Sequence, residues 1–240
     1  AEAANYPFCT IEPNEGTIPV PDERIDILSN IAKSKETIPT SLTFYDIAGL
    51  VKGASKGEGL GNKFLAHIRE VDAIIHVVRC FENENITHVN NKINPLVDIE
   101  TINTELILSD LELLEKIKSG LEKKSKSGDE DSIKKLAASE MLIKHLENDN
   151  PVISFPDIKK ISEIIKEFNL ITSKPILYIC NVDEESISTG NRFTKELENK
   201  IAQEVIIISA EIESQIASLN ADEQKEYINS IGLEESGLNK

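Results

Sequence analysis

The sequence predicts an α/β fold with a mostly parallel sheet that is interrupted by an inserted helical segment. Four short runs rich in β-branched residues are typical of buried strands, and each ends in a polar or glycine-bearing turn. These runs are Leu42–Tyr45, Ala73–Cys80, Pro175–Cys180 and Val205–Ile208. Helical stretches between them, including Asp22–Lys33 and Gly61–Glu70, supply the alternation of strand and helix. Because such sheets bind ligands at the carboxyl ends of their strands, we look for function in the residues that follow each strand.

Residues 98–170 break this alternation, because apolar residues recur there at steps of three and four and no strand pattern appears. We predict two antiparallel helices joined by a turn within Lys124–Asp131, with Asp98 as the N-cap of the first helix. The chain is therefore expected to contain one domain made of residues 1–97 and 171–240, and a coiled-coil-like insertion made of residues 98–170.

The composition excludes several classes of protein. A net charge of −16 argues against a surface that attracts nucleic acid broadly. The apolar runs are far shorter than the ~20 residues of a membrane helix, and no leader opens the chain, so we expect a cytoplasmic protein with no membrane contact. Three widely spaced cysteines fit a reducing compartment better than a disulfide framework or a metal cluster.

One stretch is locally basic. Between residues 116 and 135, seven lysines outweigh four acidic residues. The lysines lie around the predicted turn of the helical insertion, and a solvated helix face explains them as well as a surface that binds a partner.

The first chemical motif is the DxxG sequence Asp46–Gly49, which follows the first predicted strand and precedes the glycine-rich stretch Gly53–Gly61. In a P-loop NTPase such a turn senses the γ-phosphate. The Asp46 carboxylate would hold a Mg²⁺-bound water, and the Gly49 N–H would approach a phosphate without a side chain in the way. The alternative is an ordinary strand-to-helix loop capped by Asp46.

A second motif lies upstream, at Tyr6–Asn14, where Thr10 stands between two prolines. The Thr10 hydroxyl is a suitable ligand for Mg²⁺, which prefers oxygen donors. Without the neighbouring motifs, the same residues would indicate only a rigid loop.

The third and fourth strands are followed by Asn181–Glu184 and by Ser209–Ala210, at the positions of loops that recognise a nucleotide base. Guanine-specific proteins carry NKxD here, whereas this chain has Val182 and Glu184 in place of Lys and Asp. We expect guanine preference to be weak or lost. Asn181 is predicted to hold the loop, Val182 to lie against the purine ring, and the backbone of Ser209 and Ala210 to close the pocket.

Three long stretches resemble the signature sequences of the YchF/Obg-like ATPase family. They are Asn5–Asn14, Asp46–Asn62 and His76–Phe81, and the variant base motif also fits. The resemblance covers essentially the whole chain and implies a P-loop NTPase G-domain with an inserted helical hairpin. It further implies that ATP is preferred over GTP, that Mg²⁺ is required, and that the protein associates with ribosomes, especially the large subunit.

Two features depart from the family pattern. No GxxxxGKS/T sequence occurs in the chain, so we expect the phosphate-binding loop and first strand to precede residue 1 and the chain alone to bind nucleotide poorly. Residues 232–240 are similar to the segment that leads into the family's C-terminal TGS domain.

The position after the DxxG glycine, where many GTPases carry a water-orienting Gln, holds Leu50. An apolar side chain cannot orient water, so another group must assist hydrolysis, and a histidine suits that role. We place His88 ahead of His67 because it lies in the loop after the second strand, although a surface-loop histidine is the simpler interpretation. His76 is expected in the core and His145 in the insertion.

The sequence therefore predicts a Mg²⁺-dependent ATPase that acts as a ribosome-associated switch. A true GTPase and a non-hydrolysing ribosome- or RNA-binding module are the alternatives. Contact with ribosomal RNA is assigned to five lysines of the insertion, Lys116, Lys118, Lys123, Lys124 and Lys126.

Overall fold

The computed structural model describes residues 14–47, 60–83, 86, 93–201, 203–237 and 239. The chain forms two compact units, residues 1–49 and residues 50–240.

The first unit is an antiparallel hairpin with a helix in its connection. Strand β1 (Asn14–Pro19) pairs with β2 (Ser41–Asp46), and helix α1 (Glu23–Ala32) lies between them in the chain. The Asp22 carboxylate accepts a hydrogen bond from the Arg24 N–H at 3.0 Å and so caps the start of α1. The helix ends at Lys33, whose backbone is left-handed.

The strand predicted at Leu42–Tyr45 exists, but the expectation that it is buried is wrong. Only Phe44 of β2 is even partly covered, and its partner in the described structure is the antiparallel β1. The sequence of β1 carries a glycine and ends in a proline, so it lacks the apolar run that marks a strand.

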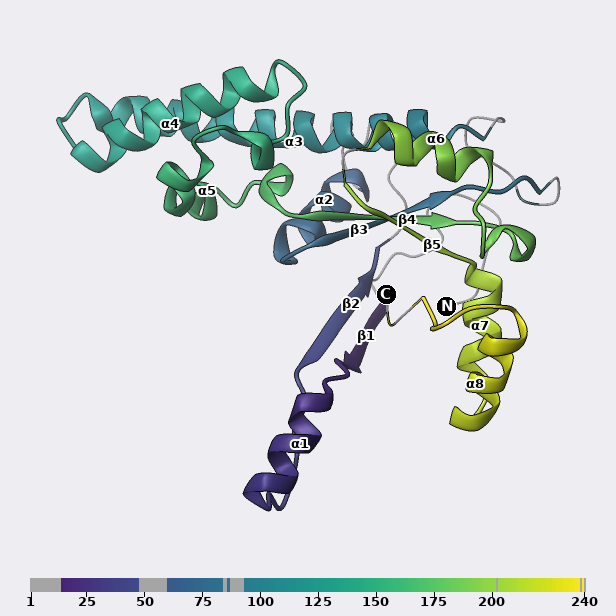
Figure 1. Ribbon diagram of the computed structural model, residues 1–240. Coiled ribbons are helices and arrows are strands. Elements are labelled where there is room, and N and C mark those ends of the chain that lie inside the picture. The colour runs from purple at the N-terminus through teal and green to yellow at the C-terminus, as the bar shows by residue number, and fades with distance from the viewer. Residues whose placement is uncertain are drawn as a thin grey trace. The chain divides into compact units, whose positions relative to one another are not determined.

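The second unit contains a three-stranded parallel sheet in the order β3–β4–β5 (Figure 1). Its strands are β3 (Ile74–Arg79), β4 (Ile176–Asn181) and β5 (Val205–Ile208). The last three predicted strands are confirmed to within one residue at each end. Register pairs Arg79 with Asn181 and Asn181 with Ile208, so the three carboxyl ends lie level with one another.

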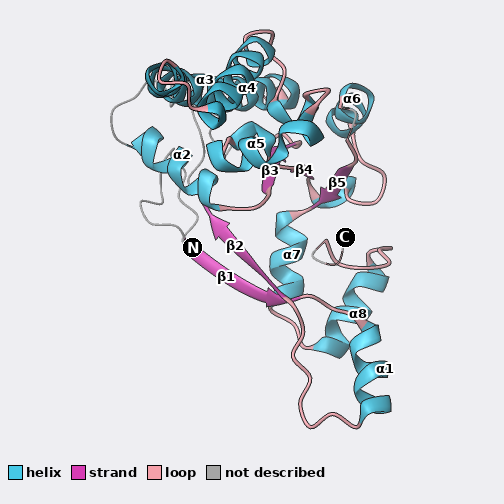
Figure 2. Cartoon of the chain, turned by 90° about the vertical axis from the view of Figure 1, so that its left-hand side faces the viewer, coloured by secondary structure: helices cyan, strands magenta, loops and turns pink. Residues whose placement is uncertain are grey.

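Helices α3 (Pro95–Ser125) and α6 (Arg192–Lys200) cover one face of this sheet (Figure 1). Helix α7 (Ala210–Ala217) follows β5 on the other side of the sheet, and α8 (Ala221–Ser230) packs beside α7 (Figure 2). Their shared core includes Val78, Tyr178, Ile99, Leu197 and Ile212. On the opposite side of the strands, Ile75, Val77 and Leu177 are exposed in the described structure.

The predicted helical hairpin is confirmed. Helix α3 runs for 31 residues and returns through α4 (Glu130–Leu146), and both contribute to a second hydrophobic core that continues into α5 (Ser162–Phe168). The prediction of Asp98 as the N-cap is wrong, because the cap is Asn94, whose side chain accepts from the Val97 N–H at 3.3 Å. Pro95 occupies the first helical position, where its missing N–H costs nothing.

Short 3₁₀ turns complete the second unit. They are η2 (Val152–Ser154), η3 (Ile158–Ile161), η4 (Ile171–Ser173) and η5 (Glu184–Ser186). No helix among the described residues is long and apolar enough to cross a membrane.

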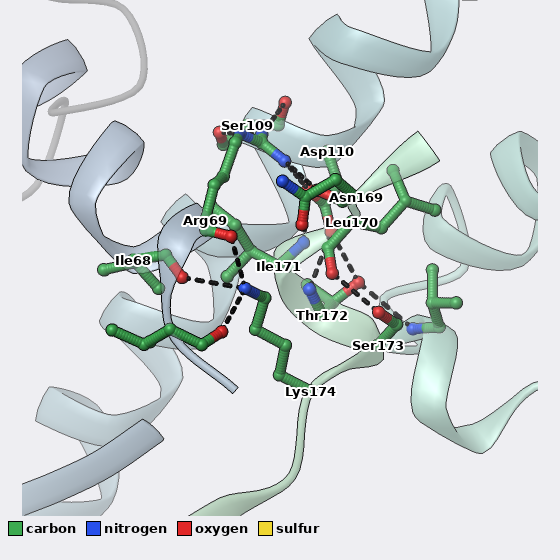
Figure 3. A network of polar contacts seen from close by, with 12 residues as sticks. Ile68, Arg69, Ser109, Asp110, Asn169, Leu170, Ile171, Thr172, Ser173 and Lys174 are labelled. Atoms are coloured by element: carbon green, nitrogen blue, oxygen red, sulfur yellow. Dashed lines mark hydrogen bonds and ion pairs between the residues drawn. The ribbon is translucent and has the colours of Figure 1, made fainter. Parts of the chain in front are cut away.

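A buried carboxylate joins the hairpin to the sheet domain (Figure 3). Asp110 of α3 is fully buried and accepts from the Ile171 N–H at 3.0 Å and from the Thr172 N–H at 2.7 Å. It also accepts from the Thr172 hydroxyl at 2.8 Å and pairs with the Arg69 guanidinium at 2.9 Å. Arg69 belongs to α2 (Leu60–Glu70), so one side chain ties α2, α3 and η4 together.

Lys174 closes the same junction from the other side. Its ammonium donates to the carbonyl oxygens of Ile68 at 3.1 Å and Arg69 at 2.6 Å, and to that of Val71. A cation at these carbonyls stabilises the end of α2, where the helix dipole is negative. Because Lys174 lies two residues before β4, the end of α2 is fixed near the start of the central strand.

Acidification should selectively destabilise this protein through His76. The imidazole lies 5.7 Å from the Tyr178 ring, and burial lowers its pKa from 6.5 to about 4 although the Asp98 charge opposes the shift. The unfolded chain then takes up the proton first, so stability is complete above pH 6.5 and falls as the pH drops toward 4. We expect a loss of roughly 2–3 kcal/mol at about pH 4.5 from this residue.

The measurement is urea unfolding at several pH values in the wild type and in His76→Gln. Carboxylates contribute equally to both proteins, so the difference between their curves isolates the imidazole. If the two proteins lose stability in parallel between pH 7 and pH 4.5, His76 is not the group responsible.

Candidate functional site

The loops that follow β4 and β5 meet at the carboxyl edge of the sheet. The Asn181 side-chain oxygen accepts a hydrogen bond from the Ala210 N–H at 2.9 Å. The Val182 N–H donates to the Ile208 carbonyl at 2.9 Å, and the Cys80 N–H donates to the Asn181 carbonyl at 2.8 Å. Asn181 therefore links the ends of all three strands.

Ser209 occupies the N-cap position of α7 without capping it through its side chain. The residue is fully buried, and its hydroxyl is the buried side-chain polar atom that lacks a hydrogen-bond partner among the described residues. Leaving such a group unsatisfied costs about 1–3 kcal/mol. An unsatisfied polar group of this kind commonly marks a place where water or a ligand completes the structure.

Glu184 begins η5 and is exposed, three residues beyond the end of β4. The Asp183 carboxylate caps this turn by accepting from the Ser186 N–H at 2.9 Å. One Glu184 oxygen accepts from the Gln215 amide of α7 at 3.0 Å, and the Gln215 carbonyl accepts from the Tyr227 hydroxyl of α8. Gln215 and Tyr227 were not predicted, since no local motif marks contacts between such distant parts of the chain.

Val182 is nearly fully buried, at 2% exposure, and packs in the core beneath the sheet edge. The structure therefore gives its side chain a packing role. If Val182 contacts a purine ring, the contact is made by its backbone atoms and not by its side chain.

Two further polar side chains organise the start of the loop that follows β3. The Arg79 guanidinium donates to the carbonyls of Phe81, Asn83 and Ile86 at 3.1–3.2 Å, and burial lowers its pKa. The Asn191 amide donates to the Cys80 carbonyl at 2.7 Å, while its oxygen caps α6. The first described residues after β3 are therefore fixed to the sheet and to α6.

The remaining predicted site residues are placed as follows. Asp46 is the exposed last residue of β2, in the first unit. Thr10, Gly49, Leu50 and His88 lie outside the described residues. Within the described part of the chain, no group of three or more His, Cys, Asp or Glu side chains could hold a metal ion.

The lysines of the insertion separate into two groups. Lys116 and Lys118 form ion pairs with Glu112 at 2.6 Å and with Glu140 at 3.8 Å. Lys123, Lys124 and Lys126 are exposed where α3 ends and the chain turns into α4. We define these last three as the tip lysines.

The chain was compared with known protein families and structures. A family model described as "50S ribosome-binding GTPase" matches residues 1–110. A protein named "Ribosome-binding ATPase YchF" from Pasteurella multocida is 50% identical over 241 residues, which cover all of this chain and 66% of that protein. The protein of the same name from Bacillus subtilis is 46% identical over 245 residues, covering all of this chain and 67% of that protein.

A solved structure, that of the Schizosaccharomyces pombe YchF GTPase, matches with a TM-score of 0.79 and 34% sequence identity. The match covers 98% of this chain and 65% of that one. The chain thus spans about two thirds of the length of the relatives that it matches.

Proposed function

This chain belongs to the YchF family, and from that premise we propose that it forms the nucleotide-binding part of a ribosome-associated nucleoside triphosphatase that prefers ATP over GTP. The observation that carries the proposal is the hydrogen bond between Asn181 and Ala210, which joins two loops at the carboxyl edge of a parallel sheet. Nucleotides bind at this edge in α/β proteins. Relatives named as ribosome-binding ATPases support the same activity.

The base is proposed to contact Asn181, the backbone of Val182, Ser209 and Ala210, and to lie near Glu184. The unsatisfied Ser209 hydroxyl supports a ligand at this place. ATP preference is proposed to follow from Val182 and Glu184. A Glu in place of the usual Asp moves the carboxylate away from the two guanine donors, and also away from adenine N1, an acceptor with which a carboxylate cannot pair. Catalysis is proposed to involve Gly49, the position of Leu50, and His88.

Mg²⁺ is the proposed cofactor, with Thr10 as a direct ligand and Asp46 acting through a bound water. Both residues offer oxygen donors, and Asp46 is exposed, so the donor chemistry fits this ion. The ion would supply positive charge to the phosphates.

The ribosome, in particular its large subunit, is the proposed partner, and the cytoplasm is the proposed location. Residues 98–170 are proposed to act as a separate insertion that projects from the nucleotide-binding residues 1–97 and 171–240. The two separate hydrophobic cores support this division.

Calorimetric titration of ATP and of GTP, each with Mg²⁺, tests the proposal. It should be carried out with this chain and with a form extended at its N-terminus by a GxxxxGKS/T loop, and hydrolysis should then be measured with and without ribosomes. Tighter binding of ATP by the extended form supports the proposal. Tighter binding of GTP supports the GTPase alternative, and binding of neither nucleotide supports a non-hydrolysing module.

A further inference from the structure

Glu184 does not stand alone at the sheet edge, because α7 and α8 hold its carboxylate through two consecutive hydrogen bonds. Gln215 donates its amide to one Glu184 oxygen at 3.0 Å, and the Tyr227 hydroxyl donates to the Gln215 carbonyl. Helix α8 is itself fixed to α7, since the Gln224 amide donates to the carbonyls of Ile216 at 3.0 Å and Leu219 at 3.1 Å. The Glu184 carboxylate is therefore oriented from a fixed frame.

The Tyr227 hydroxyl determines the orientation of the Gln215 side-chain amide. A glutamine amide can present either its oxygen or its NH₂ group to a neighbour. Because Tyr227 donates to the amide oxygen, the NH₂ group must face Glu184. Tyr227 is partly buried against the core, which limits its freedom to turn away.

We propose that Gln215 and Tyr227 are specificity-determining residues that disfavour GTP by drawing the Glu184 carboxylate toward α7. This inference rests on the proposed function. Guanine offers two parallel donors, its N1–H and its exocyclic amine, and recognition requires both carboxylate oxygens to face them. Because the bond to Gln215 fixes the direction of one oxygen, Glu184 must turn its carboxylate to make that paired contact, and this turn weakens or breaks the bond to the amide. Adenine makes no such demand, so its binding is unaffected.

The substitution Gln215→Leu removes the donor while keeping a side chain of similar size on an exposed helical surface. We expect GTP affinity to rise about threefold to tenfold, the worth of one hydrogen bond, while ATP affinity changes by less than about twofold. Tyr227→Phe should act in the same direction with a smaller effect, because the Gln215 amide is then free to turn its oxygen toward Glu184. Gln203→Leu, at an exposed glutamine before β5, is the matched control and should leave both affinities unchanged.

The experiment is competitive titration of ATP and GTP, with Mg²⁺, into the form of the protein extended at its N-terminus by a GxxxxGKS/T loop. Thermal unfolding first confirms that each variant is folded. If the wild type binds ATP and Gln215→Leu raises the GTP-to-ATP affinity ratio, the inference holds; a lower ratio overturns it. If the wild type binds ATP but both variants keep its ratio, the inference is overturned and the proposed function stands. If the wild type binds neither nucleotide, the proposed function fails and the inference falls with it.

Discussion

Replacing Asp110 with alanine is expected to destabilise the second unit by about 3–5 kcal/mol, the usual cost of removing one partner of a buried ion pair. The carboxylate is fully buried and accepts from four donors. Two of the donors are the backbone N–H groups of Ile171 and Thr172, both in fully buried or nearly fully buried residues. Alanine would leave them, the Thr172 hydroxyl and the Arg69 guanidinium without their acceptor, and each unsatisfied buried group adds to the loss.

Urea denaturation of the variant and the wild type measures this effect. Asp157→Ala is the matched control, since Asp157 pairs with Lys160 at 2.8 Å on the exposed surface, where an ion pair contributes little to stability. A loss for Asp110→Ala no larger than that of the control would contradict the assigned role. Thr172→Val provides an intermediate case, because it removes a hydroxyl that both donates to Asp110 and accepts from the Val152 N–H at 3.2 Å.

The sheet of the second unit was predictable because its strands are continuous apolar runs, which is the pattern of strands buried in a parallel sheet. β5 was predicted with its exact bounds, and β3 and β4 to within one residue at each end. β1 was missed for the opposite reason, since an edge-type sequence with Gly16 and Pro19 carries no such run. The N-cap error at Asp98 arose from reading the apolar stripe alone, although Asn94–Pro95 is itself a helix-start signal.

Some residues of the candidate site could be predicted from the sequence, and others could not. Asn181 and Ala210 could be brought together from the sequence, because both follow strands of one parallel sheet and therefore lie at one edge. Gln215, Tyr227 and Asp110 could not, since each acts through side-chain contacts that depend on how helices pack and leave no periodic pattern. The burial of Val182 is a similar case, because a residue after a strand can turn either toward a ligand or into the core.

We propose that the tip lysines contact ribosomal RNA and contribute to ribosome binding. Neutralising all three, as Lys123→Gln, Lys124→Gln and Lys126→Gln together, is expected to weaken binding about 10²- to 10³-fold near 0.1 M salt. The reason is that each of the three proposed contacts between a tip lysine and an RNA phosphate would release a counterion, so the slope of log affinity against log salt should also fall by about 3. Ribosome co-sedimentation over a range of salt concentrations measures both quantities.

Lys116→Gln with Lys118→Gln is the comparison variant. The sequence also assigned RNA contact to these two lysines, but they pair with Glu112 and Glu140, so we expect a smaller loss than for the tip lysines. Acidic residues also lie at the tip, but Asp129 is engaged in capping α4, where it accepts from the Ser132 N–H at 3.0 Å. A hydrogen bond with the Ser132 side chain, then the bond from the Ser132 N–H, and to a lesser degree the charges of Lys124 and Lys135 lower the pKa of Asp129. The Asp129 charge therefore stabilises the start of α4, while the tip lysines are exposed to solvent. Equal losses in both variants would mean that binding follows total charge, and no loss in the triple variant would remove the hairpin tip from the ribosome interface.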